Sequence, residues 1–107
     1  MVSEVDSVRL RELEATFDPD AGLARSDERL WVAFNSLEYA ILLLRRDQAG
    51  DRQRAAAIVD AVLATQMHEP DWDRGRFPMS LPETWRDLNA NLFLAPELVE
   101  IYEHWLP

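Results

Sequence analysis

The sequence predicts an all-α fold of antiparallel helical hairpins with about five helices, and two observations predict it. Apolar residues recur at steps of three and four along most of the chain, which is the period of an amphipathic helix. Proline, glycine and aspartate interrupt these stripes at a few places, where one helix ends and the next begins. We therefore expect residues 1–107 to form a single helical domain or a fragment of a larger one.

The first two predicted helices are separated by the breaker sequence 18–22, which contains proline, glycine and two aspartates. The first helix runs from about Ser3 to Phe17, and the second runs from Asp27 to Asp47. The apolar face of the second helix is the most regular in the chain. It consists of Leu30, Phe34, Leu37, Ile41 and Leu44. The carboxyl-terminal half of this helix is apolar nearly all round, so we expect more than one neighbour to cover it.

The third predicted helix extends from Asp51 to Met67 and follows a connection of only three residues, 48–50. Such a short connection makes the second and third helices antiparallel neighbours. A fourth helix is expected to begin at Ser80, because residues 80–83 form a capping box with proline in the first turn. The sequence 95–97 interrupts it, and a last helix carries Leu98, Ile101 and Trp105.

Composition and charge exclude several classes of function. The net charge of −9 repels phosphate backbones and acidic membrane surfaces, so neither nucleic acid nor a membrane is an expected partner. The chain has no cysteine and no lysine, which excludes disulfides, thiolate zinc sites and Schiff-base chemistry. We expect no cofactor. The acidic start 1–6 does not resemble a signal peptide, and the longest apolar run, 39–44, is too short to span a bilayer, which favours a cytoplasmic location.

The long connection 68–80 and the start of the following helix combine aromatic, acidic and arginine side chains, as carbohydrate sites do. Aromatic faces stack on sugar rings, and charged groups bind hydroxyls. The candidate substrate-binding residues are Trp72, Arg74, Phe77, Trp85 and Asn89. The candidate catalytic carboxylates are Asp71, Asp73 and Asp87, because glycoside hydrolysis uses paired carboxyl groups. The alternative is that the aromatic residues pin the loop to the core while the aspartates cap turns and pair with arginines.

Other polar residues have structural interpretations. Glu100 and His104 share a helix face but lack a third ligand, so no metal site is predicted. Ser36 and Ser80 stand outside any nucleophile motif; we interpret Ser80 as a helix cap and Ser36 as a small residue at a helix contact. A cluster of arginines surrounds the turn between the second and third helices and forms either an anion site or a solvated corner balanced by aspartates. These arginines are Arg45, Arg46, Arg52 and Arg54.

Three stretches of sequence occur together in a familiar order: 35–40, 54–66, and 75–78 followed by 85–89. Over about residues 30–94 this order resembles uncharacterised α/α-toroid proteins related to glycoside hydrolases and polysaccharide lyases, although Leu88 stands where an aromatic residue is expected. The resemblance implies inner and outer rings of paired helices, with the loop 68–80 on the sugar-binding rim and with Trp85, Asp87 and Asn89 near the cleft. A toroid needs about a dozen helices, so the chain would supply only its amino-terminal part.

Two functions are therefore predicted, and whether the chain is an enzyme stays open. The first is a carbohydrate-active toroid fragment, inactive alone, whose partner is the remainder of a larger chain. The end of the sequence just after an apolar patch favours this interpretation. The alternative is a non-enzymatic helical interaction module, whose apolar helix faces are covered by a partner or by self-association.

Overall fold

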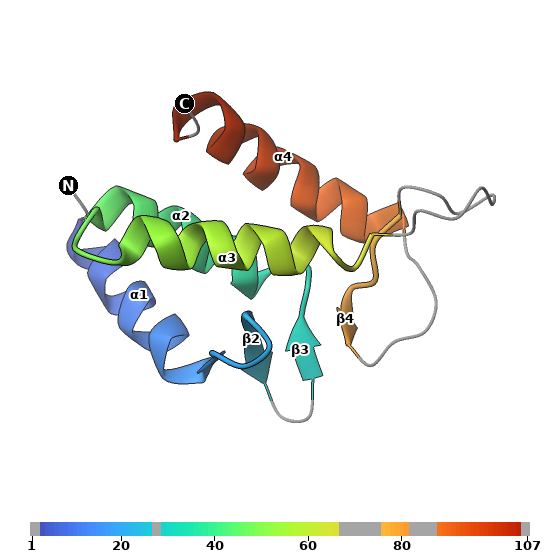
Figure 1. Cartoon of the computed structure of the whole chain (residues 1–107), viewed down its shortest axis with the longest axis horizontal. Helices are drawn as coiled ribbons and strands as arrows, with labels where there is room; N and C mark the ends of the chain where they lie inside the picture. Colours follow the sequence, from blue (N-terminus) through green and yellow to red (C-terminus); the bar gives the residue numbers. More distant parts are fainter. Residues whose placement is uncertain (1–2, 27–28, 67–75, 82–87, 106–107) are drawn as a thin grey trace.

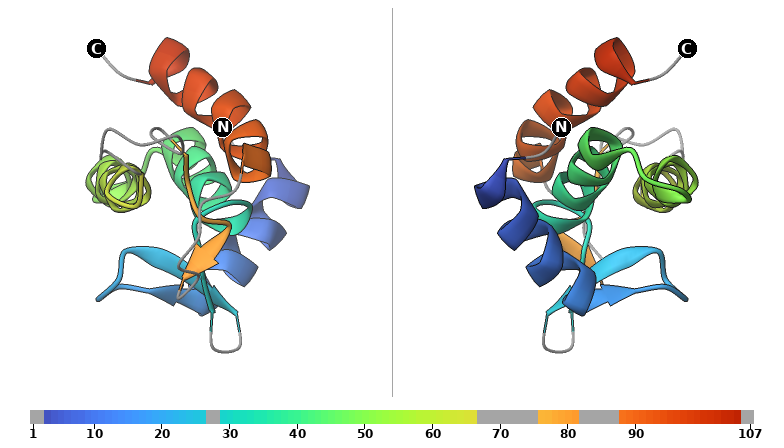
Figure 2. Two further views of the ribbon diagram at one scale, coloured as in Figure 1. Left: turned by 90° about the vertical axis from the view of Figure 1, so that its right-hand side faces the viewer. Right: turned by 90° about the vertical axis from the view of Figure 1, so that its left-hand side faces the viewer.

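The computed structural model describes residues 3–26, 29–66, 76–81 and 88–105, and within them the chain forms four helices and a four-stranded sheet. Helix α2 lies in the middle of the molecule, with α1 and α3 on either side, α4 above it and the sheet below (Figures 1 and 2). The elements are α1 (Glu4–Thr16), β1 (Phe17–Asp18), β2 (Leu23–Ser26), β3 (Arg29–Trp31), α2 (Asn35–Arg46), α3 (Asp51–Leu63), β4 (Ser80–Leu81) and α4 (Leu88–His104).

The sheet shows that the all-α prediction is wrong, and with it the ring of paired helices that a toroid requires. Its strands are all antiparallel and lie in the order β1-β2-β3-β4. The breaker sequence is a turn between β1 and β2, as its composition predicted. The carboxylate of Asp18 accepts hydrogen bonds from the backbone N–H groups of Asp20 and Ala21, and Gly22 adopts a φ of +75°.

The second helix begins eight residues later than predicted, because Leu30 belongs to β3 and Phe34 lies in the turn before α2. Leu30 pairs with Leu81 of β4, and this contact between distant parts of the chain overrides the helical spacing. Phe34 has a φ of +71°, and this positive φ turns the backbone sharply between β3 and α2. Ser36, in the first turn of α2, is buried and hydrogen-bonds to β2 and β3 instead of only allowing close helix packing.

The turn between α2 and α3 and the antiparallel packing of the two helices agree with the prediction, but α3 ends at Leu63 instead of Met67. Asp47 and Gly50 both have positive φ, at +52° and +86°, and they reverse the chain between the two helices. The guanidinium of Arg46 donates two hydrogen bonds of 2.8 Å to the buried carboxylate of Asp51, which fixes the end of α2 against the start of α3. The two helices lie side by side in Figures 1 and 2.

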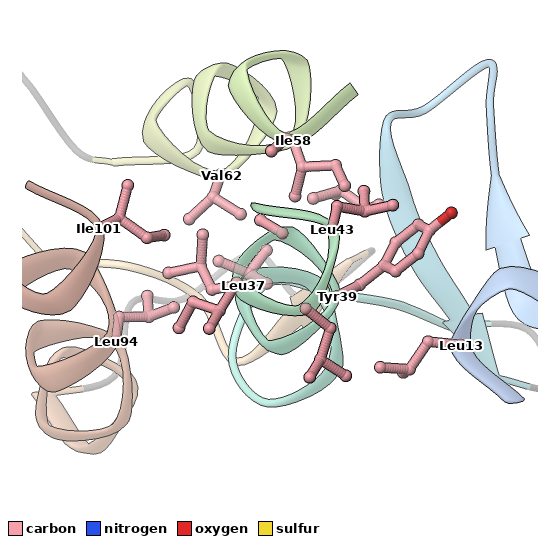
Figure 3. Packing of buried hydrophobic residues seen from close by; sticks show 14 of the residues in the cluster. Leu13, Leu37, Tyr39, Leu43, Ile58, Val62, Leu94 and Ile101 are labelled. Atoms are coloured by element: carbon pink, nitrogen blue, oxygen red, sulfur yellow. The ribbon is translucent and has the colours of Figure 1, made fainter. Parts of the chain in front are cut away.

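The core surrounds α2, eight of whose twelve residues are buried. Leu13 of α1 approaches α2 from one side, Ile58 and Val62 of α3 from another, and Leu94 and Ile101 of α4 from a third (Figure 3). The prediction that several neighbours cover this helix is therefore confirmed. Those neighbours all belong to this chain, however, so the apolar character of α2 does not by itself require an outside partner.

Helix α4 differs from the two separate helices predicted for the last part of the chain. It is one helix from Leu88 to His104, and Pro96 lies inside it without ending it. A proline removes one backbone donor, but buried residues on both sides of Pro96, among them Leu94 and Ile101, hold the helix to the core. Ser80 lies in β4 and accepts a hydrogen bond from Arg29 at 3.0 Å. The helix start that Ser80 is predicted to cap includes residues 82 and 83, which lie outside the described residues, so the cap stays a prediction. No helix among the described residues has the length and apolar character needed to cross a membrane.

Candidate functional site

Most of the predicted sugar-binding segment lies outside the described residues. This holds for Asp71, Trp72, Asp73, Arg74, Trp85 and Asp87, and also for the side chain of Asn89, whose backbone is in the first turn of α4. Phe77 is described: its side chain is buried in the core, and its N–H donates to Asn91 at 3.0 Å. The position of Phe77 agrees with the alternative in which aromatic residues pin this segment to the core. For the other residues, carbohydrate binding stays a prediction.

The arginines around the turn between α2 and α3 are balanced by aspartates, which is one of the two interpretations proposed for this cluster. Arg46 pairs with Asp51 at 2.8 Å, and Arg52 pairs with Asp47 at 3.3 Å. Within the described part of the chain no group of acidic or histidine side chains is arranged to hold a metal ion. Helix α4 contributes to the lining of an apolar hollow and of a polar one.

The first surface is an apolar groove between α3 and α4, which we call the α3–α4 groove. Helix α4 runs obliquely past α3 (Figure 1), and Ile101 and Trp105, near the carboxyl end of α4, contribute to the lining of the groove. The groove has a volume of about 380 Å³ and is apolar except for one arginine and one aspartate. Its lining consists of Leu44, Arg52, Ala55, Ala56, Val59, Asp60, Leu63, Ile101 and Trp105.

Trp105 leaves the groove chemically incomplete. Its indole Nε1–H is buried and has no hydrogen-bond partner among the described residues. A buried donor without a partner costs about 1–3 kcal/mol. The sequence identified the apolar face formed by Leu98, Ile101 and Trp105, but it did not show that this face borders a groove against α3.

The outer surface of α4 is also apolar, which sequence reasoning missed. Leu92, Val99 and Tyr102 are exposed by 67%, 53% and 73%, and with the exposed Ala95 they follow steps of three, four and three. This spacing is typical of a helix seam that packs against another helix. The signal was present in the sequence, but the assumed interruption at Pro96 divided the seam into two segments.

The second surface is a polar cleft, the α1–α4 cleft, which lies over α2 and has a volume of about 470 Å³. Four carboxylates and two arginines line it together with a few apolar side chains. These charged residues are Asp6, Arg9, Glu38, Arg45, Glu97 and Glu100. Arg9 donates to both carboxylate oxygens of Glu38, at 3.1 and 2.8 Å, and these bonds raise the pKa of the arginine above its usual value. Arg45 lies 3.4 Å from both Asp6 and Glu100.

Glu97 is the unusual group in this cleft. Burial, together with the nearby carboxylates of Glu38 and Glu100, raises the pKa of its carboxyl group to about 7. It forms no hydrogen bond or ion pair with the described residues. The rings of Phe34 and Phe93, whose centroids are 4.7 Å apart, lie beside it in an adjoining hollow. The raised pKa of Glu97 could not be predicted from the sequence, because nothing in the local pattern distinguishes Glu97 from a solvated glutamate.

Comparisons of the chain with protein-family models, with curated proteins and with solved structures found no significant match. These comparisons therefore do not test the resemblance to toroid proteins. The function has to be argued from the two surfaces described above, and the α3–α4 groove is the one whose lining indicates what it would bind.

Proposed function

We propose that this chain is a protein-interaction module, and that its α3–α4 groove binds an amphipathic helix of a partner protein. The observation that carries the proposal is the groove itself, an apolar channel between two helices that Trp105 and eight other residues line. Recognition of a helix in a groove depends on such a lining, into which the partner inserts apolar side chains spaced by one turn.

The composition of the lining supports a protein partner. The exposed Ala56 leaves room on α3 for a partner's large side chains, and Leu63 and Trp105 supply apolar walls. Leu63 remains 39% exposed in the isolated chain, so a partner would remove further apolar surface from water. Tryptophans at interfaces often contribute a large share of the binding energy, particularly when a polar atom is satisfied by the partner.

Charge complementarity indicates what flanks the partner's apolar face. The groove itself carries one arginine and one aspartate, whereas the whole chain carries a net charge of −9. A second copy of the chain would bring the same net negative charge, and like charges at an interface are unfavourable. The net charge therefore favours a partner helix whose apolar residues are flanked by basic ones.

The experiment uses designed peptides, because the natural partner is unidentified. A helical peptide of about 16 residues covers about 24 Å. One version has leucines along one face and arginines on its flanks, and a matched version has glutamates instead of the arginines. Calorimetric titration should show binding of the basic peptide and weaker binding of the acidic one. Failure of both peptides to bind would contradict the proposal, as would a stable dimer of the chain in light scattering.

Substitution of Ala56 by arginine should weaken binding of the basic peptide at least about tenfold, which corresponds to about 1.4 kcal/mol. Ala56 is exposed and lines the groove, so an arginine there fills the channel and repels a basic partner without disturbing the core. Ala57→Arg is the matched control, because Ala57 is exposed on the same helix but does not line the groove. Equal affinities of the two variants would show that the peptide binds elsewhere.

A further inference from the structure

The α1–α4 cleft contains more acidic than basic side chains, and its two arginines are already engaged. Arg9 is held by Glu38, by Glu12 at 3.1 Å and by the side-chain oxygen of Asn35 at 3.1 Å. Arg45 lies 3.4 Å from Asp6 of α1 and equally far from Glu100 of α4, and it thereby connects the two helices.

Glu97 faces charged groups from every element around the cleft. Helix α1 contributes Asp6 and Arg9, α2 contributes Glu38 and Arg45, and α4 itself contributes Glu100. With Glu97 ionised, four carboxylates oppose two arginines within one partly enclosed space. With Glu97 protonated, one of these negative charges is removed and the others keep their ion pairs.

Glu97 also lies at the interface through which α4 packs on the rest of the molecule. Leu94 and Ile101, on the same side of the helix, are buried in the core that surrounds α2. Phe34 and Phe93 line a second hollow together with Glu97. A charge at this position is therefore partly removed from water and has no described cation of its own, whereas a neutral carboxyl group is tolerated.

We infer that Glu97 is a pH-sensitive switch in the packing of α4, and that loss of its proton loosens α4 from α1 and α2. The raised pKa of Glu97 agrees with the inference that the geometry supports. The folded state binds the proton of Glu97 more tightly than the unfolded state does. The packing of α4 is therefore strongest at pH values below 4.5, the ordinary pKa of a glutamate. It weakens as the pH rises toward about 7 and stays weak above that value. This switch acts whether or not the groove binds a helix.

The distance between α1 and α4 tests the inference directly. The chain has no cysteine, so spin labels can be placed only where cysteines are introduced, at Arg11→Cys on α1 and His104→Cys on α4. Both positions are exposed and neither lines the cleft. Pulsed electron paramagnetic resonance should show one narrow distance distribution at pH 5.5 and a broader, longer one at pH 8.

The decisive comparison is the same labelled chain with Glu97→Gln, which is expected to keep the narrow distribution at both pH values. Glu103→Gln is the control, because Glu103 is an exposed carboxylate on α4 outside the cleft, and it should retain the full pH response. A pH response that persists in the Glu97→Gln chain would overturn the inference, and so would unchanged distances in the parent chain. As a second measurement, urea unfolding between pH 5 and 7 should show a smaller decrease in stability for Glu97→Gln.

Discussion

Replacing Asp51 with asparagine is expected to lower the free energy of unfolding by about 2–3 kcal/mol at neutral pH, since it removes the nearer of the two carboxylates that pair with a partly buried arginine, Arg46. Only 6% of the Asp51 side chain is exposed, against 22% for Arg46. Asparagine keeps the size of the side chain but removes the charge that accepts two 2.8 Å bonds from Arg46 and a 2.9 Å bond from the N–H of Gln48. Urea unfolding followed by circular dichroism measures the loss.

The same substitution should also change the acid sensitivity of the protein. Hydrogen bonds from Arg46 hold the pKa of Asp51 below its usual value, so the carboxylate contributes stability that is fully present above the unfolded value of about 3.9. This contribution is lost as the pH falls through the lower folded-state pKa. The asparagine variant should therefore lose less stability between pH 5 and pH 2 than the parent chain does.

Asp47→Asn is the matched control for both measurements. Asp47 pairs with Arg52 in the same corner, but the two side chains are 57% and 62% exposed, so their pairing is worth little. Asparagine also tolerates the left-handed backbone of this position, which has a φ of +52°. We expect a change below about 0.5 kcal/mol. A comparable loss in both variants would mean that the buried Arg46–Asp51 pair stabilises the fold no more than the exposed Arg52–Asp47 pair does.

The α2–α3 hairpin was predictable because its signals are local. Gly50 and a short connection mark the turn, and an apolar stripe continues on each side of it. Strands β1 to β4 have only two to four residues, which is too short for alternation of apolar and polar residues to be recognised. Their pairing joins residues as distant as Leu30 and Leu81, and no window of sequence contains that contact. Leu30 and Phe34 matched the helical period without belonging to a helix.

The two surfaces were less predictable than the helices that form them. The sequence identified Ile101 and Trp105 as apolar, but the groove exists because α3 lies against them, and that is a tertiary contact. The same holds for Glu97, whose proton affinity depends on burial between α1, α2 and α4 rather than on its neighbours in sequence. Predicting either would have required the angle at which α4 crosses the hairpin.

Ser36→Ala is the other substitution with a large expected effect, because one hydroxyl group joins α2 to two strands. Ser36 is fully buried; its Oγ accepts the backbone N–H of Ala24 in β2 at 2.9 Å and donates to the carbonyl oxygen of Trp31 in β3. Alanine fits the same space but leaves both backbone groups without this partner. At about 1–3 kcal/mol for each buried polar group, we expect a loss of about 2–3 kcal/mol in the free energy of unfolding.

Hydrogen exchange distinguishes this cause from a general loss of packing. In Ser36→Ala the amide of Ala24 should exchange much faster, while amides in the middle of α3, such as that of Ile58, should change only in line with global stability. Thr16→Ala is the control, since its exposed hydroxyl bonds to Leu13 within the same helix and its loss should cost less than about 0.5 kcal/mol. If Ser36→Ala kept both its free energy of unfolding and the protection of the Ala24 amide, the two hydrogen bonds of this hydroxyl would contribute nothing to stability. The sheet would then be attached to α2 by side-chain packing alone.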